Sequence, residues 1–132
     1  MKLTLVTPEK KMLTNVEVDE IIVPAYKGQL DILPGHAPLM TTLTAGVLKV
    51  RLAGETTFKS ASISWGYLQV NSLGVNILAE TAEWSSEIDK NRVQANYAEA
   101  EKRLQAAGLG PDDYANLARK MEKEKARLEL VQ

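Results

Sequence analysis

The chain has 132 residues, a formal net charge of −1 and no cysteine. Its composition, 45% hydrophobic and 25% charged, is typical of a globular protein with one core, or of a small domain with an appendage. These values exclude disulfides, thiolate metal sites and a cysteine nucleophile, and they disfavour nucleic acid or an anionic membrane as the main partner.

The sequence contains no candidate membrane anchor or leader. No segment approaches the roughly 20 apolar residues that a membrane-spanning helix needs. The opening segment, Met1–Pro8, is too short for the apolar region of a signal peptide and lacks a small-residue cleavage site. We therefore expect the protein to stay on the cytoplasmic side and to meet a membrane only through another protein.

The first part of the chain alternates apolar and polar residues with a period of two, which is typical of half-buried strands. The alternation is clear at 47–52 and 75–79, and it slips phase within 16–23, which predicts a β-bulge near Asp19 or Glu20. Breaks that contain glycine predict hairpin turns. They fall at residues 27–28, 53–55 and 71–74. Many short strands at this spacing favour an antiparallel sandwich or barrel.

From residue 86 onward the apolar residues recur every three or four positions, which predicts helices. Ser86 is the predicted N-cap of the first helix, and the Gly-Leu-Gly-Pro segment at 108–111 ends it. The apolar face of this helix comprises Val93, Tyr97, Ala100, Leu104 and Ala107. Asp112 or Asp113 opens a second helix. The apolar line of the second helix comprises Tyr114, Leu117, Met121, Leu128 and Val131.

Two helices joined by so short a loop are expected to fold back as an antiparallel hairpin. The predicted fold class is therefore α+β, with a β-sandwich domain at 1–84 and a helical hairpin at 85–132. Because the first helix is rich in alanine, contacts between the helices bury little area, and we hypothesise that the hairpin is only marginally held closed.

The sequence offers little catalytic chemistry. The single histidine, His36, lies in a loop with two prolines and a glycine, and no Gly-x-Ser-x-Gly element accompanies it. One histidine with scattered carboxylates is weak support for a metal site. The Walker phosphate-binding loop and the dinucleotide glycine pattern are both absent. We therefore predict a protein that is not an enzyme, with no catalytic residue and no metal site.

Four segments of the chain carry a resemblance to a known family. They are 3–8, 28–38 (Gly-Gln-Leu-Asp-Ile-Leu-Pro-Gly-His-Ala-Pro), 45–50 and 75–82. Together they resemble the epsilon subunit of bacterial F-type ATP synthases, and 28–38 is the most specific of them. One departure is clear: where the family usually has a Gly-Gly-Phe type of segment, this chain has Trp65-Gly66-Tyr67. The resemblance implies a ten-stranded antiparallel β-sandwich followed by an antiparallel two-helix hairpin.

The resemblance also implies a non-catalytic rotor subunit of a proton-translocating ATP synthase at the cytoplasmic face of the bacterial inner membrane. The sandwich would lie against the gamma subunit and the c-ring. The implied interface residues are Gln29, Leu30, Asp31, Leu33, Gly35 and His36, with Gln29 the nearest to the polar loop of the ring. His36 is then expected to be a structural residue of a rigid loop, because its flanking prolines limit conformational freedom.

In this family the hairpin either folds against the sandwich or extends along gamma, where it obstructs rotation and suppresses ATP hydrolysis. Extended, basic residues of the second helix meet an acidic segment of the beta subunit, beside alpha. The implied docking residues are Arg119, Lys120, Lys123 and Arg127. From the pattern alone, the same side chains also fit a solvated helix face with Glu/Lys pairs.

Some members of the family bind ATP as a regulatory ligand in the folded hairpin. The candidates here are Ile88, Asp89 and Arg92, although Val93 departs from the alanine of the family motif. The plainer interpretation is a capped helix start, and apart from ATP no cofactor is expected. The alternative to a rotor subunit is a free-standing β-sandwich binding module whose helical tail recruits an unrelated acidic partner.

Overall fold

Alternating burial defines the strands of the first 84 residues. The computed structural model describes residues 1–106 and 108–131. Their strands are β1 (Lys2–Val6), β2 (Lys11–Ala25), β3 (Gly28–Ile32), β4 (Leu39–Leu43), β5 (Gly46–Leu52), β6 (Lys59–Ile63), β7 (Gly66–Asn71), β8 (Gly74–Ala79) and β9 (Ala82–Trp84). In β8, for example, Val75, Ile77 and Ala79 are buried while the residues between them are exposed.

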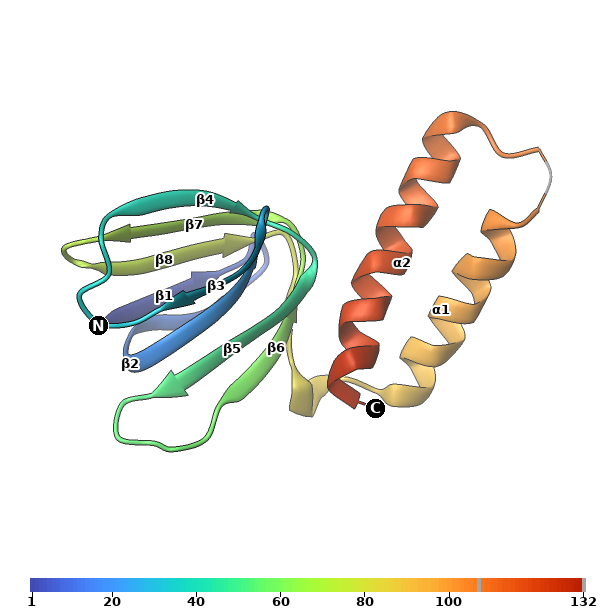
Figure 1. Ribbon diagram of the computed structural model, residues 1–132. Helices are drawn as coiled ribbons and strands as arrows, with labels where there is room; N and C mark the ends of the chain where they lie inside the picture. The colour runs from blue at the N-terminus through green and yellow to red at the C-terminus, as the bar shows by residue number, and fades with distance from the viewer. Residues whose placement is uncertain (107, 132) are drawn as a thin grey trace.

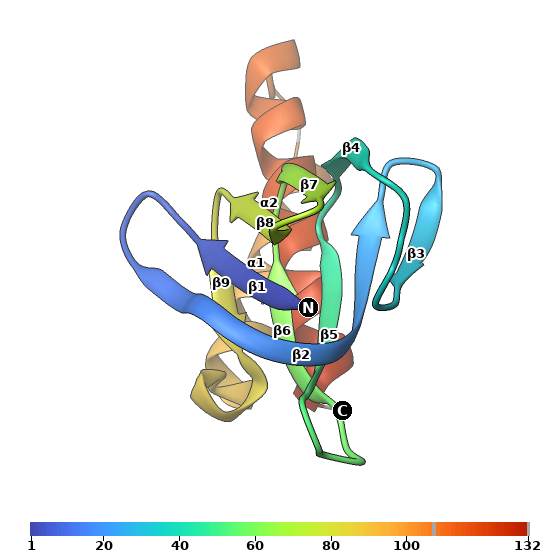
Figure 2. The same cartoon turned by 90° about the vertical axis from the view of Figure 1, so that its left-hand side faces the viewer.

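The strands form two layers that share one long strand. β1, β8, β7 and β4 follow one another in the first layer, and β3, β2, β5, β6 and β9 in the second. The first part of β2 pairs with β1, and its second part pairs with β5 and β3, so β2 curves across both layers (Figure 2). The bulge predicted near Asp19 or Glu20 is confirmed, because the β2–β5 register shifts between Val18 and Glu20.

The predicted β-sandwich followed by two helices is confirmed, with two differences in detail. The described residues form nine strands rather than ten. The bulge bends β2 without interrupting it, so β2 counts as one strand although it pairs in both layers. The pairing of β1 with β8 is parallel, whereas the other pairings are antiparallel. The edge of β1 that does not pair with β2 pairs with β8. Because β8 is the second strand of the β7–β8 hairpin, it runs in the same direction as β1.

The hydrophobic core lies between the two layers. Its buried members all come from residues 3–84, and they include the fully buried side chains of Leu3, Ile21, Leu48, Leu68 and Ile77. Burying a side chain of this size stabilises the fold by about 1.5–3 kcal/mol. The described part of the helical segment contributes no member of this cluster, so the sandwich has a core of its own.

A short 3₁₀ turn, η1 (Ser85–Glu87), leads into α1 (Lys90–Leu104) and α2 (Pro111–Val131). The predicted N-cap Ser86 is wrong, because it lies inside η1 and Ile88 has an extended backbone. Asp89 caps α1 instead: its Oδ1 accepts a hydrogen bond from the Arg92 main-chain N at 3.2 Å. Ala107, predicted to end the apolar face of the first helix, lies outside the described residues.

The hairpin lies against one layer of the sandwich through α2. This helix packs on β5 and β6, and α1 packs on α2 farther from the sheet (Figure 1). The prediction that Tyr114 joins the apolar line of the second helix is wrong: it is 57% exposed, because the first turn of α2 lies at the end of the hairpin that projects beyond the sandwich. Neither described helix combines the length and apolar character that crossing a bilayer requires.

Candidate functional site

The turn that follows β3 is shaped by Pro34 and Gly35. The main-chain N of His36 donates a hydrogen bond to the Leu33 carbonyl at 3.1 Å, and Gly35 has a φ of +86°. A type II turn requires positive φ at its third position, which favours glycine, and proline is common at its second position. The Nδ1 of His36 lies 2.7 Å from the Ala37 carbonyl oxygen, which only accepts, so Nδ1–H is the donor. The imidazole is therefore bonded to the loop's own main chain.

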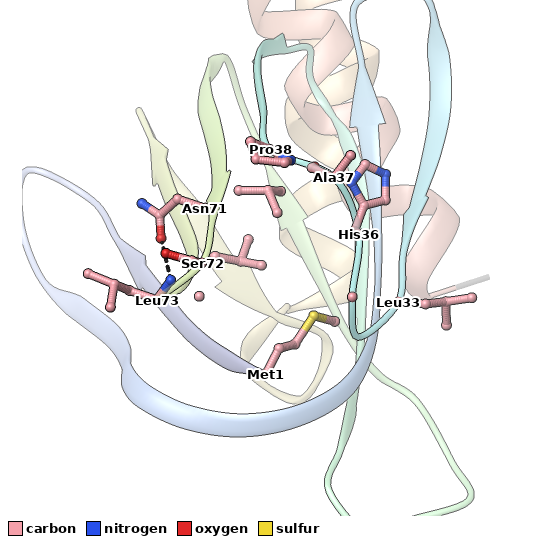
Figure 3. Close-up of a pocket in the computed structure, with 12 residues that line it drawn as sticks. Met1, Leu33, His36, Ala37, Pro38, Asn71, Ser72 and Leu73 are labelled. Carbon is pink, nitrogen blue, oxygen red and sulfur yellow. Dashed lines mark hydrogen bonds between the residues drawn. The ribbon is translucent and has the colours of Figure 1, made fainter.

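A cavity of about 360 Å³ lies between this turn and the β7–β8 hairpin (Figure 3). Leu33 and His36 line one side, Met1 lies below, and the hairpin residues 71–75 line the other side. At the hairpin tip the Leu73 main-chain N donates to Asn71 Oδ1 at 2.8 Å, and the Leu73 side chain is 87% exposed. Within residues 1–106 and 108–131 no group of His, Asp and Glu side chains could hold a metal ion.

The six predicted interface residues divide between two places. Leu33, Gly35 and His36 line the cavity at the end of the sandwich. The other three belong to β3, where Gln29 and Asp31 are exposed and Leu30 is half-buried. Gln29 and Leu30 line a second cavity, of about 260 Å³, between β3 and β4, whereas Asp31 lines neither cavity.

An exposed apolar surface was missed by the sequence analysis. Met40 on β4, Tyr67 on β7 and Leu78 on β8, with Tyr26 in the β2–β3 turn, form what we call the outer patch, and their exposed fractions run from 44% to 70%. Tyr67 and Leu78 are directly paired across β7 and β8. Exposed apolar patches mark protein interaction sites. The available signal was an apolar residue out of phase: Leu78 falls between the buried residues of β8.

The basic face of α2 is turned toward the sandwich. A cavity of about 380 Å³ lies between this helix and the sheet. All four predicted docking residues line it: Arg119, Lys120, Lys123 and Arg127. Trp65 and Glu80 contribute the sandwich side of the cavity, and Asn116 and Glu124 also line it. In this conformation the four cations are gathered at the boundary between the hairpin and the sandwich rather than spread over a solvated face.

Arg119 contacts the sandwich directly. Its Cζ lies 3.9 Å from the centroid of the Trp65 ring, and its Nη2 lies 3.3 Å from Glu80 Oε2. The guanidinium is thus in contact with an aromatic face and a carboxylate together, the two kinds of partner that suit its planar charge. Glu80 had no role in the sequence analysis, because nothing in its local pattern indicates a partner 39 positions away.

A buried ion pair lies deeper in the same cavity. Arg127 Nη1 is 2.8 Å from Glu124 Oε1, and Glu124 is only 4% exposed. The second carboxylate oxygen of Glu124 and the Nε of Arg127 find no hydrogen-bond partner among the described residues. Buried charges are costly unless they are paired and fully hydrogen-bonded, so this pair makes the interface easier to open.

The three candidate nucleotide-binding residues lie at the start of α1 and have partners of their own. Asp89 caps the helix, and Arg92 Nη2 lies 3.4 Å from Glu83 Oε1 on β9. Ile88 is half-buried, and its main-chain N donates to the Ser85 carbonyl. None of the three lines the cavity that gathers the cations of α2, so the described structure does not bring the two predicted groups together.

The comparisons with known proteins agree on one family. The family model described as "ATP synthase, Delta/Epsilon chain, beta-sandwich domain" matches residues 1–85. An ATP synthase epsilon chain of Bdellovibrio bacteriovorus is 47% identical over 132 residues, covering 100% of this chain and 94% of the relative. The ATP synthase epsilon chain of Geobacter metallireducens is 42% identical over 113 residues, covering 86% of this chain and 78% of the relative.

Two solved structures have the same fold. One is a chain of the Euglena gracilis mitochondrial ATP synthase, in a cryo-EM structure of its OSCP, F1 and c-ring in rotational state 1. It matches with a TM-score of 0.85 and 25% identity, over 99% of this chain and 80% of that chain. A chain of the Tetrahymena thermophila central stalk and c-ring matches with a TM-score of 0.68 at 18% identity, over 100% and 96%, and shows the fold alone.

These matches confirm the resemblance that segments 3–8, 28–38, 45–50 and 75–82 carry. They confirm the prediction of a non-catalytic ATP synthase subunit, and they decide against a free-standing binding module. The family model spans the sandwich, and the Bdellovibrio relative extends the match through both helices. The chain therefore belongs to the family of ATP synthase epsilon chains.

Proposed function

We propose that this epsilon chain acts in the rotor of a proton-translocating bacterial ATP synthase, where its sandwich joins the gamma subunit to the c-ring and its hairpin inhibits ATP hydrolysis. It would be a peripheral protein, held at the cytoplasmic face of the inner membrane by the complex. The observation that carries the proposal is the likeness, over 99% of the chain, to a chain of a solved ATP synthase assembly that includes F1 and the c-ring.

Two separate surfaces of the sandwich support two partners. The end that holds the 33–36 turn and the exposed Leu73 is the proposed contact with the c-ring. Gln29 lies at the other end of β3, where it lines a cavity with Tyr26 of the outer patch. The outer patch is the proposed contact with gamma, because its large apolar side chains are exposed to solvent in the described structure. A subunit that transmits rotation needs both contacts, since one alone would leave it free to turn.

Replacing His36 tests the first surface. The variant His36→Ala removes the bond from Nδ1 to the Ala37 carbonyl and loosens the loop at the cavity. We expect weaker assembly with the membrane sector and reduced coupling between proton flow and ATP synthesis. Coupled synthesis at the parent rate in the variant would contradict a role for this loop.

The hairpin is the proposed inhibitory element. The cations gathered between α2 and the sandwich are the ones expected to meet an acidic segment of beta when the hairpin extends. A surface that faces the sandwich in one conformation and beta in the other suits a switch, because the two sets of contacts exclude each other. The incompletely bonded Glu124–Arg127 pair supports an interface that can open.

The test is reconstitution with alpha, beta and gamma, with ATP hydrolysis as the readout. A chain truncated after Glu87 keeps every buried member of the sandwich core, and we expect it to assemble normally and to relieve inhibition. Lys123→Gln, which alters a cavity-lining cation, should relieve inhibition in part. Lys125→Gln is the matched control, because Lys125 is exposed on the same helix outside that cavity. A hydrolysis rate that truncation leaves unchanged would contradict the inhibitory role.

We propose ATP binding in the folded hairpin as a second candidate function. The cavity with four cationic side chains favours it, because the Arg127 Nε has no acceptor among the described residues and a phosphate would supply one. Participation of Arg92 would require its release from Glu83. Calorimetric titration of the full chain with ATP should give heat that Arg127→Gln abolishes, and comparison with Arg92→Gln reports whether the start of α1 takes part. No heat at millimolar ATP would contradict this function.

A further inference from the structure

Trp65 and Glu80 are held together on the surface of the sandwich by hydrogen bonds that do not involve the helices. The Glu80 main-chain N donates to the Trp65 carbonyl at 2.8 Å. Beside them the hydroxyl oxygens of Ser64 and Thr81 are 2.7 Å apart, and the Thr81 N donates to Ser64 Oγ at 3.0 Å. Ser64 is buried, so the two loops that carry Trp65 and Glu80 are fastened to each other from inside.

Arg119 of α2 fills the position that these two residues define. Its guanidinium lies 3.9 Å from the Trp65 ring centroid and 3.3 Å from Glu80 Oε2. Because the main chains that carry the two partners are already fixed, only side chains lose freedom when the contact forms. Within residues 1–106 and 108–131, the Arg119–Glu80 pair is the one ion pair that joins α2 to the sandwich; the Glu124–Arg127 pair lies within α2.

We propose that the contact of Arg119 with Trp65 and Glu80 is a latch that sets how often the hairpin leaves the sandwich. The inference rests on the proposed inhibitory function, because Arg119 is also one of the residues expected to dock on beta. While the latch is engaged, Arg119 is unavailable for docking, and α2 cannot extend without breaking the stack and the ion pair together. The latch therefore opposes inhibition.

The aromatic ring carries most of this effect. Arg119 and Glu80 are each about half exposed, and an exposed ion pair alone stabilises little. The Trp65 face adds a contact that depends on the planar guanidinium, and an ammonium group reproduces it poorly. Trp65→Leu keeps bulk and removes the ring, Glu80→Gln removes the ion pair, and Arg119→Lys keeps the charge that docking needs while losing the planar fork.

The opening of the hairpin can be measured by the reactivity of one introduced thiol. The parent chain has no cysteine. Ser62 on β6 is buried. Its neighbours Ala61 and Ile63 belong to the sandwich core, but Ser62 does not. The helix α2 packs on this strand. A thiol in the Ser62→Cys background therefore reacts with a soluble disulfide reagent when α2 lifts away, and its labelling rate follows the population of the open hairpin even when that population is small.

We expect Trp65→Leu to raise the labelling rate in the full-length chain by about 3- to 10-fold, and Glu80→Gln by about 2- to 3-fold. Arg119→Lys should lie between the parent and Trp65→Leu. The matched control is Phe58→Leu, which makes the same kind of change at a ring 6.0 Å from Arg51 Cζ. Phe58 belongs to the β5–β6 loop, which lies away from α2 (Figure 1). This control should leave the rate unchanged. Parent labelling rates in Trp65→Leu and Glu80→Gln would overturn the latch, and either variant suffices if the other fails to fold.

The reconstituted complex separates this inference from the function on which it rests. Trp65→Leu leaves all four docking residues in place, so a freer hairpin should inhibit ATP hydrolysis more strongly. Faster labelling with unchanged hydrolysis would support the latch and contradict the inhibitory function. Parent labelling in the variants, with hydrolysis still released by truncation after Glu87, would overturn the latch and leave the inhibitory function standing.

Discussion

Removing the Arg127 side chain should open the hairpin without unfolding the sandwich. In Arg127→Ala, Glu124 loses the hydrogen bond to Oε1, and its Oε2 has no described partner even in the parent. The carboxylate would then be buried and unpaired. Lifting α2 from the sheet returns the Glu124 carboxylate to water. The variant can therefore avoid the cost of burying this charge by moving the hairpin, without unfolding the sandwich.

The size of the effect follows from the burial of the pair. Breaking a buried ion pair by removing one partner costs about 3–5 kcal/mol. The Arg127 side chain is 18% exposed, so water can approach one side of the pair, and the lower end of the range applies. A cost of about 3 kcal/mol corresponds to an open population increased by roughly 100-fold. The free energy of unfolding of the sandwich should not change, because its core lies within residues 3–84.

The thiol of Ser62→Cys beneath α2 measures this change as a labelling rate. The double variant Glu124→Met with Arg127→Met is the control, because apolar residues of similar volume often replace a buried ion pair at little or no cost. We expect it to label at nearly the parent rate. A rate in Arg127→Ala within threefold of the parent would refute the reasoning, since it would mean that Glu124 finds solvent or another partner without any opening.

Three further changes test the sandwich and the start of the hairpin. Gly66→Ala would bring a Cβ into the Leu78 carbonyl oxygen and should lower the free energy of unfolding by about 3 kcal/mol in urea titrations, whereas Gly110→Ala, whose added Cβ would meet only Asp113 Oδ2 at 4.0 Å, should not. Ile77→Ala should cost about 2–5 kcal/mol in the same assay and Ile77→Val about 0.5–1.5 kcal/mol, and equal losses would contradict its place in the core. Asp89→Ala should destabilise α1 by about 1 kcal/mol, seen as faster amide exchange in its first turn, and Asp89→Ser should restore it.

Local patterns predicted the sandwich well because its strands obey short-range rules. The phase slip in 16–23 located the bulge of β2, since an extra residue inverts the alternation wherever one face is buried. The proline and glycine of the 33–36 turn likewise satisfy a conformational requirement that can be read from four residues. The parallel pairing of β1 with β8 could not be found in this way, because it joins residues more than 70 positions apart.

The hairpin was harder to predict because neighbouring residues compete for the same role. Ser86 and Asp89 are both good caps, and the choice depends on Glu87, whose carboxylate accepts from the Trp84 main-chain N and stabilises the 3₁₀ turn. Glu124 has the sequence context of a solvated helix face, yet it is buried against the sandwich. Glu124 is buried because α2, and not α1, covers the sheet. Both helices carry an apolar stripe, so local patterns do not show which of them packs on the sheet.

The long bent strand β2 has a mechanical consequence. Its main chain is bonded to β1 in one layer and to β5 and β3 in the other, so sliding one layer over the other would load many of these bonds in shear at once. Such an arrangement resists deformation more than two sheets joined only by side-chain packing. A twisting force applied at either end of the domain therefore rotates it as a solid body instead of being lost as internal strain.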